Sequence, residues 1–199
     1  MFLYYFIKIL TAMLFMLFYS FKVIYEDRIP DEPCIFVANH QSLLDPIAVV
    51  DALNRKVIFL ASEDLYKIPI LNYILITTGN IPIKKKSADI NAIKRALNVL
   101  NKGYSIALFP EGGISPNGEL KEGYKGAMYL SYKSGRPIVP IGINGTYDIM
   151  PLGKYKLGEG KISVKIGSAI YPDMSLPKNE SIETLKDKVM HKVKKLIEA

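Results

Sequence analysis

Residues 34–46 have the sequence CIFVANHQSLLDP, which joins an apolar run to a polar segment and the start of a helix. Its apolar start, residues 34–38, predicts a buried strand that ends at Asn39-His40. Asp45 and Pro46 are typical of the first turn of a helix, with Asp as its cap. His40 therefore falls between a strand and a helix, close before a carboxylate. An imidazole moves protons near neutral pH, and a carboxylate on its second nitrogen fixes the tautomer, so His40 and Asp45 are candidate catalytic residues.

The rest of the chain alternates between strand and helix patterns. Further strands are expected at 56–61, 80–84, 105–109, 138–143 and 161–166. Helices are expected at 45–53, 64–77 with a break near Pro69, 88–102, 124–133 and 181–197. This alternation predicts an α/β fold with a mixed, mostly parallel sheet flanked by helices. Ligands of such sheets collect beyond the carboxyl ends of the strands.

The N-terminus is strongly apolar. Residues 1–21 contain one charge, Lys8, and predict a membrane-associated helical segment over 1–25, followed by one folded domain over 26–199. Lys8 leaves open whether the helix spans the membrane or lies in one leaflet. A signal peptide and a buried soluble helix are the competing interpretations. Lys22 and Arg28 favour a location at the cell membrane with the domain on its cytoplasmic face.

Composition narrows the function classes. With 199 residues and 49% hydrophobic residues, the chain is long and apolar enough for a buried core. A formal charge of +7 favours anionic partners. The single cysteine, Cys34, excludes an intrachain disulfide. The second histidine, His191, lies far away in the sequence and no Cys/His spacing suits zinc, so neither a metal nor a cofactor is expected. Nucleic-acid binding is disfavoured by the apolar N-terminus.

Three polar segments fall at predicted strand ends: 39–45, 79–86 and 109–115. Each one alone has a simple interpretation: a loop histidine beside a helix cap, a solvated run of lysines, and a tight turn with a carboxylate. Their appearance together, in this order and after an apolar N-terminus, favours one shared functional site.

The three segments resemble a known family, the 1-acylglycerol-3-phosphate acyltransferases, which are the lysophosphatidic acid acyltransferases of the PlsC type. The N-H-x4-D motif of that family matches Asn39, His40 and Asp45. Its F-P-E-G-T-R-S motif matches Phe109, Pro110, Glu111, Gly112 and Ser115. Its glycine-led second block matches 79–83, with Lys85 where arginine is usual, and its V-P block matches 138–141. The resemblance covers roughly residues 33–170.

The resemblance implies transfer of a fatty acyl group from acyl carrier protein (ACP) or coenzyme A (CoA) to the sn-2 hydroxyl of lysophosphatidic acid, giving phosphatidic acid. His40 becomes the general base and Asp45 orients it. The implied substrate-binding residues are Asn39, Lys84, Lys85, Glu111, Gly112, Gly113, Ser115 and Lys125. Backbone N–H groups near Gly112 and Gly113 are candidate oxyanion donors. The segment 26–199 then becomes an acyltransferase domain.

Two departures concern the acceptor. Gly113-Ile114 stands where the family has Thr-Arg, and Lys85 replaces an arginine. Both positions are associated in the family with the acceptor's phosphate, and lysine lacks the bidentate fork of arginine. Lys84, Lys86 and Lys125 are candidates for compensation. The acceptor is therefore less determined by the sequence than the reaction class.

Alternative functions remain. The acceptor can be another lysolipid, or the chain can be a non-catalytic protein that binds anionic lipid through residues 84–86 and its basic C-terminal helix. A serine-hydrolase triad of Ser42, His40 and Asp45 is disfavoured, because the chain has no G-x-S-x-G elbow.

Overall fold

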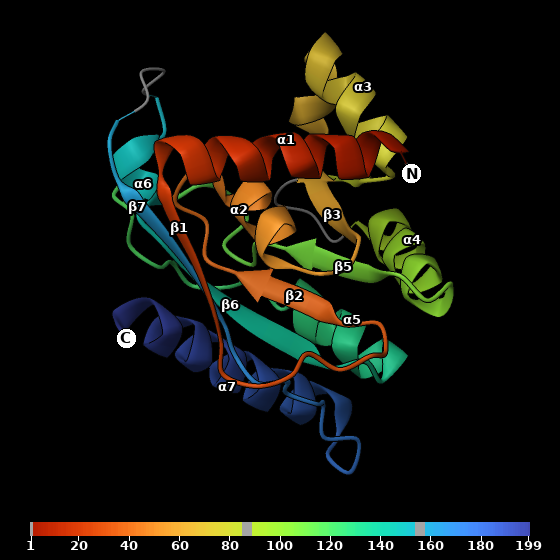
Figure 1. Ribbon diagram of the computed structural model, residues 1–199. Coiled ribbons are helices and arrows are strands. Elements are labelled where there is room, and N and C mark those ends of the chain that lie inside the picture. The colour runs from red at the N-terminus through yellow and green to blue at the C-terminus, as the bar shows by residue number, and fades with distance from the viewer. Residues whose placement is uncertain (1, 85–88, 154–157) are drawn as a thin grey trace.

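The computed structural model describes residues 2–84, 89–153 and 158–199, and it is built on one mixed sheet (Figure 1). The described strands are β1 Ser20–Tyr25, β2 Ile35–Ala38, β3 Val57–Ser62, β4 Ile81–Ile83, β5 Ser105–Leu108, β6 Ile138–Asn144 and β7 Lys161–Ile166. Their order across the sheet is β1-β7-β6-β2-β5-β3-β4. The neighbours β6 and β7 are antiparallel, and all other neighbouring pairs are parallel. The predicted mixed, mostly parallel sheet is confirmed.

Helices cover both faces of the sheet. They are α1 Phe2–Phe18, α2 Asp45–Ala52, α3 Pro69–Thr78, α4 Ile90–Asn101, α5 Gly126–Ser134, α6 Thr146–Ile149 and α7 Lys178–Glu198, with a 3₁₀ turn at Glu63–Lys67. Side chains of α1 and α2 share one apolar cluster with one face of the sheet. Side chains of α4, α5 and α7 form the second cluster on the other face. The central strand β2 is buried along its whole length, and its carboxyl end leads into the candidate site.

The N-terminal segment differs from the prediction. Helix α1 ends at Phe18, and Ser20–Tyr25 form strand β1, which pairs in parallel with β7. The expected helical segment over 1–25 was therefore too long. Phe21 and Val23 pack against the core while Lys22 is exposed, and this two-residue period was hidden within a continuous apolar run. Among the residues that the structure describes, none of the helices has both the length and the hydrophobicity needed to cross a bilayer.

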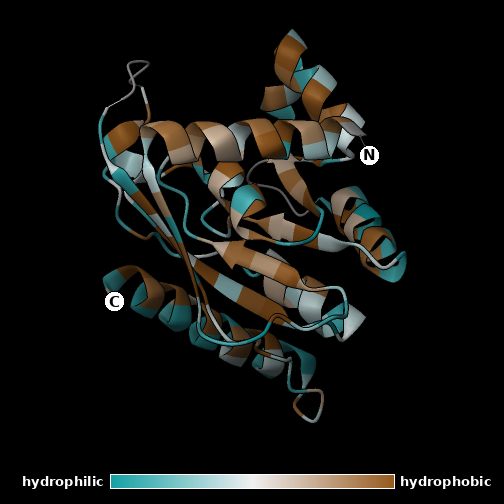
Figure 2. Ribbon diagram, viewed as in Figure 1, coloured by the Kyte–Doolittle hydropathy of each residue, from teal (hydrophilic) through white to brown (hydrophobic). Residues whose placement is uncertain are grey.

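Helix α1 turns its polar side chains toward the protein. Lys8 donates a hydrogen bond to the carbonyl of Leu53, and the Thr11 hydroxyl donates to the Asp51 carboxylate at 3.0 Å. The helix is mostly apolar, as Figure 2 shows by colour, and it exposes large apolar side chains on its outer side. The most exposed large apolar side chains on this outer side are Ile9, Met13, Met16, Leu17 and Phe18. Because its polar side chains face the protein and its apolar side chains face outward, α1 leaves an uncovered apolar surface on the outside of the molecule.

Candidate active site

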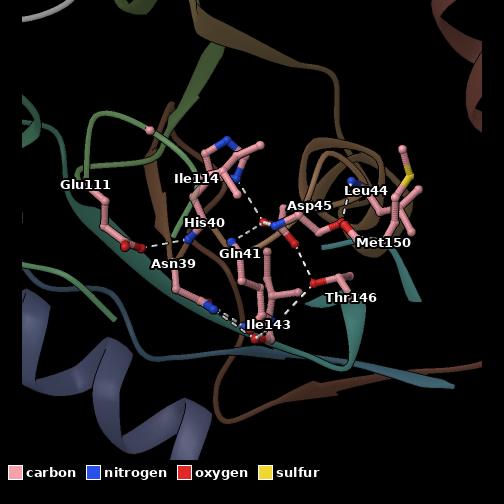
Figure 3. A network of polar contacts seen from close by, with 12 residues as sticks. Asn39, His40, Gln41, Leu44, Asp45, Glu111, Ile114, Ile143, Thr146 and Met150 are labelled. Atoms are coloured by element: carbon pink, nitrogen blue, oxygen red, sulfur yellow. Dashed lines mark hydrogen bonds and ion pairs between the residues drawn. The ribbon is translucent and has the colours of Figure 1, made fainter. Parts of the chain in front are cut away.

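His40 and Asp45 meet at the junction of β2 and α2 (Figure 3). The Nδ1 atom of His40 lies 2.9 Å from Oδ2 of Asp45. The Asp45 side chain is fully buried, whereas that of His40 is 14% exposed. A carboxylate only accepts hydrogen bonds, so Nδ1 carries the proton and Nε2 is left as the basic nitrogen. Within the described part of the chain, no hydrogen bond reaches Nε2. The pair therefore has the geometry of a histidine base with its orienting carboxylate.

Three further donors hold the Asp45 carboxylate. The backbone N–H groups of Gln41 and Ser42 donate to Oδ2 at 2.6 and 2.7 Å. The hydroxyl of Thr146 donates to Oδ1 at 2.6 Å. A buried carboxylate loses its hydration, and these contacts compensate for that loss. Asp45 is thus fixed before any substrate arrives, and it fixes the imidazole in turn.

Asn39 and Gln41 join the end of β2 to the end of β6. The side-chain amide of Asn39 donates to the carbonyl of Ile143 at 2.9 Å and accepts from its N–H at 2.7 Å. The amide nitrogen of Gln41 donates to the Ile143 carbonyl and to the Thr146 hydroxyl. Asn39 was predicted to bind substrate, but it is buried and its amide is occupied by Ile143. The geometry gives it a positioning role.

Gly145 makes the approach of Thr146 possible. Its φ of +85° is a left-handed conformation that glycine adopts readily. A Cβ atom at this position would lie 1.8 Å from the carbonyl oxygen of Lys161. Thr146 could not be identified from the sequence, because about a hundred residues separate it from Asp45 and no local motif marks it.

The segment after β5 forms hydrogen bonds with the backbone of His40. Glu111 accepts hydrogen bonds from the N–H of His40 at 2.7 Å and from the N–H of Lys121 at 3.0 Å. The N–H of Ser115 donates to the carbonyl of His40 at 2.7 Å. Burial raises the pKa of Glu111, and the two N–H donors oppose this shift. Glu111 is thus a site-organising carboxylate that links residue 40 to the turn over 110–115.

Phe109 sets the plane of the imidazole. Its ring stacks on the imidazole of His40, with ring centroids 4.0 Å apart and planes 17° apart. Phe59 is a second aromatic neighbour of the Phe109 ring, with ring centroids 6.0 Å apart. Together with Asp45, this stack leaves the ring of His40 little rotational freedom.

The two glycines of the turn differ. The N–H of Gly112 donates to the carbonyl of Phe109 at 3.2 Å, so it is already used by the turn. Gly112 has a φ of +70°, and a Cβ there would lie 2.7 Å from the Tyr124 ring. The N–H of Gly113 has no partner within the described ranges. Of the two candidate oxyanion donors, Gly113 is the one left available.

The predicted serine ligand points into its own loop. The buried Ser115 hydroxyl donates to the side chain of Asn117 at 2.9 Å. Ser42, considered for a hydrolase triad, donates its hydroxyl to the carbonyl of Met150 at 2.7 Å. Since that proton is directed away from His40, the geometry does not form a serine nucleophile.

Of the predicted lysines, the structure describes Lys84 and Lys125, and neither has a hydrogen bond or ion pair with residues 39–45 among the described contacts. Lys84 is exposed and lines a separate hollow of about 360 Å³ to which residues 39–45 and 109–115 do not contribute. Lys85 and Lys86 lie outside the described residues. Lys125 pairs with Glu183 of α7.

The cation at the turn is one that the sequence analysis missed. The ammonium group of Lys121 donates to the carbonyls of Gly113 at 2.7 Å and Ile114 at 3.3 Å. Its position in a loop with no motif of its own gave no signal. In the part of the chain that the structure describes, no group of three His, Cys, Asp or Glu residues is arranged to hold a metal ion.

Known proteins are similar to this chain in sequence. The family model described as Acyltransferase matches residues 20–144. The chloroplastic 1-acyl-sn-glycerol-3-phosphate acyltransferase BAT2 of Brassica napus is 35% identical over 71% of this chain and 42% of its own length. Human 1-acyl-sn-glycerol-3-phosphate acyltransferase beta is 26% identical over 69% of this chain and 51% of its own length. This chain thus spans about half the length of these curated relatives.

A solved structure is similar over nearly the whole chain. The crystal structure of the 1-acyl-sn-glycerophosphate (LPA) acyltransferase PlsC from Thermotoga maritima superposes with a TM-score of 0.79 at 28% identity. The match covers 97% of this chain and 79% of that one.

Proposed function

This chain belongs to the acyltransferase family, and we propose that it transfers a fatty acyl group from acyl-ACP or acyl-CoA to the sn-2 hydroxyl of lysophosphatidic acid. The products are phosphatidic acid and the free thiol of the donor, in a step of phospholipid biosynthesis. The observation that carries this proposal is the His40–Asp45 pair, held at 2.9 Å beside the 110–115 turn with Nε2 available. The names of the similar relatives support the acceptor.

The reaction follows from the available nitrogen. Nε2 of His40 removes the hydroxyl proton as the acceptor oxygen attacks the thioester carbonyl carbon. The imidazolium that forms is stabilised by the Asp45 carboxylate. The tetrahedral intermediate collapses, the carbon–sulfur bond breaks, and the thiolate leaves with the proton from Nε2. The Gly113 N–H is the candidate donor to the oxyanion.

The N-terminus supports a membrane-surface location. The outer side of α1 and the neighbouring helix α3 together expose large apolar side chains; those on α3 include Ile70, Tyr73 and Ile76. Exposed large apolar side chains on two neighbouring helices suit insertion into one leaflet. We propose that α1 attaches the acyltransferase domain to the cytoplasmic face of the cell membrane. Replacing Met13 and Leu17 by Glu should release the protein from sedimenting vesicles, while its activity on detergent-dispersed substrate persists.

The activity is tested with purified protein, labelled palmitoyl-CoA or palmitoyl-ACP, and lysophosphatidic acid. We expect phosphatidic acid as product, and we expect His40→Ala to lose most of the turnover, about 10²–10⁴-fold, without unfolding. Full turnover by His40→Ala contradicts the assignment of the base. Absence of product from the wild type with both donors contradicts the proposed reaction and favours a non-catalytic lipid-binding protein.

A second acceptor class is favoured by one observation. Ile114 brings no charge to the turn where the resembled motif has arginine. The same assay with lysophosphatidylcholine and lysophosphatidylglycerol decides between the acceptors. If lysophosphatidylcholine or lysophosphatidylglycerol is acylated faster than lysophosphatidic acid, that lysolipid becomes the proposed acceptor. The proposed role of His40 does not change.

A further inference from the structure

A basic hollow lies beside the catalytic turn, between the 120–123 segment and helix α7. Its volume is about 350 Å³. The charged or titratable side chains that line it are Lys121, Glu122, Lys186, Asp187, His191 and Lys194. None of the residues of the proposed reaction centre, 39–45 and 109–115, contributes to its described lining. The hollow is therefore distinct from the proposed reaction centre at His40 and Asp45.

The charges in this hollow do not cancel. Lys186 is neutralised by Glu122 at 2.6 Å, and Lys194 has only a 3.8 Å contact with Glu198. The ammonium group of Lys121 is bound by two carbonyl oxygens, and no ion pair joins it to a carboxylate within the described ranges. Carbonyl groups satisfy hydrogen bonds but leave the net charge. Three lysines line the hollow against two carboxylates, Glu122 and Asp187, so its lining keeps an excess of one positive charge, which suits an anion.

The hollow is connected to the reaction centre by short contacts. The N–H of Lys121 donates to Glu111, which also binds the N–H of His40. Gly123 forms part of the wall, and a Cβ atom there would lie 2.6 Å from Sδ of Met190 and 3.2 Å from Cβ of Pro110. The wall of the hollow at Gly123 is therefore packed closely against Pro110 of the catalytic turn.

We propose that this hollow binds the phosphate of the phosphopantetheine arm that acyl-ACP and acyl-CoA share. The inference rests on the proposed acyl transfer. The acceptor carries its phosphate on the carbon next to the reacting one, so that phosphate must lie beside Nε2 of His40. The donor carries its phosphate at the far end of the pantetheine arm, so that phosphate must lie away from His40. A site outside the reaction centre but joined to its turn matches the donor.

The placement of α7 agrees with a donor that arrives from water. Helix α7 covers the face of the sheet opposite to α1, as Figure 1 shows. The proposed membrane surface is on the α1 side. A lipid acceptor then enters from one side of the sheet, and a soluble thioester enters from the other.

The test compares Lys194→Glu with Lys195→Glu. Both residues are exposed neighbours on α7, and only Lys194 lines the hollow, so the two variants are matched in charge and in helix. KM and kcat are measured with palmitoyl-CoA, palmitoyl-ACP and S-palmitoyl-N-acetylcysteamine, which has no phosphate. We expect Lys194→Glu to raise the KM for the phosphate-bearing donors by about fivefold or more. The KM for the phosphate-free thioester and for lysophosphatidic acid should not change, and Lys195→Glu should behave as wild type.

The outcomes separate the possibilities. A higher KM for both natural donors identifies the shared arm phosphate, and a higher KM for palmitoyl-CoA alone identifies its nucleotide phosphates as the occupant instead. An equal effect on the phosphate-free thioester, a change in the KM for lysophosphatidic acid, or identical behaviour of the two variants overturns the donor site. Wild-type turnover of the phosphate-free thioester reports acyl transfer without the hollow, so failure of this inference is distinguishable from failure of the proposed function.

Discussion

Helix α2 carries an aspartate at each end, and the two have opposite surroundings. Asp45 begins the helix, where the helix dipole favours a negative charge. Asp51 lies in the last turn, where the dipole opposes it. Asp45 receives hydrogen bonds from His40, Gln41, Ser42 and Thr146. The same residue type on one helix is thus fully supported at one end and poorly supported at the other.

Asp51 faces helix α1. The Thr11 hydroxyl donates to its Oδ1 at 3.0 Å, and its buried Oδ2 has no hydrogen-bond partner among the described residues. Burial raises the pKa of Asp51 to about 6, although Thr11 and the charge of Lys8 oppose the shift. The end of α2 at the proposed reaction centre is therefore organised in advance, whereas its contact with α1 contains a buried oxygen without a described hydrogen-bond partner.

Asp45→Asn should have the largest effect. An asparagine side chain has one acceptor oxygen and an NH₂ group that only donates. It cannot accept hydrogen bonds from Nδ1–H of His40 and from the other three donors together, so the tautomer and the ring position of His40 are lost. We expect kcat to fall by about 10³–10⁴-fold, with folding checked by circular dichroism. A loss of less than about tenfold would show that His40 does not depend on this carboxylate.

Glu111→Gln should have an intermediate effect. One of the two N–H groups, of His40 or Lys121, would face an amide NH₂ in place of an acceptor, which loosens the 110–115 turn. We expect kcat to fall by about 10–100-fold, with little change in the KM for lysophosphatidic acid. A rise in that KM at unchanged kcat would instead make Glu111 a ligand of the acceptor.

Thr146→Val tests how many donors Asp45 needs. Valine keeps the shape and removes the hydroxyl that donates to Oδ1 at 2.6 Å. The loss of one charge-assisted hydrogen bond should lower kcat by about tenfold. Thr146→Ser keeps the hydroxyl and should retain most of the activity. If both variants match the wild type, the remaining three donors suffice.

Local sequence was enough to predict the scaffold and the dyad. The strand over 34–38 and the start of the helix are set by neighbouring residues, so His40 and Asp45 were identifiable from a short stretch. The prediction of Asp45 as the helix cap was wrong, because Leu44 is the N-cap and the Asp45 carboxylate turns back to His40. Strand β1 was missed because its two-residue period merges with the apolar run before it. The alternating pattern of β1 is present in the sequence, but nothing in the sequence separates it from the apolar run of α1.

The supports of the dyad were not predictable in the same way. Thr146 reaches Asp45 across a distant turn that depends on Gly145, and Lys121 reaches the 113–114 carbonyls by folding back along an irregular loop. Neither contact leaves a periodic or motif signal, because both are set by tertiary packing. The resemblance to a family supplied the proposed catalytic residues, and the contacts among buried polar groups show what holds those side chains in place.

Asp51→Asn is the counterpart of Asp45→Asn and should have the smallest effect. Because the pKa of Asp51 is about 6 in the fold against an ordinary 3.8, the folded state binds this proton more tightly than the unfolded chain. Stability then falls as the pH rises from about 4 to 6, and the cost persists above pH 6. Removing the charge should stabilise the protein at pH 7.5 by at most about 1 kcal/mol, since the group is partly exposed, and should change nothing near pH 4.

Thermal unfolding of Asp51→Asn and of the wild type at pH 4 and pH 7.5 measures this difference in stability, with acyl transfer as the control. A lower melting temperature at pH 7.5 would mean that attraction to Lys8 outweighs burial, and a loss of activity equal to that of Asp45→Asn would erase the contrast between the two ends of the helix.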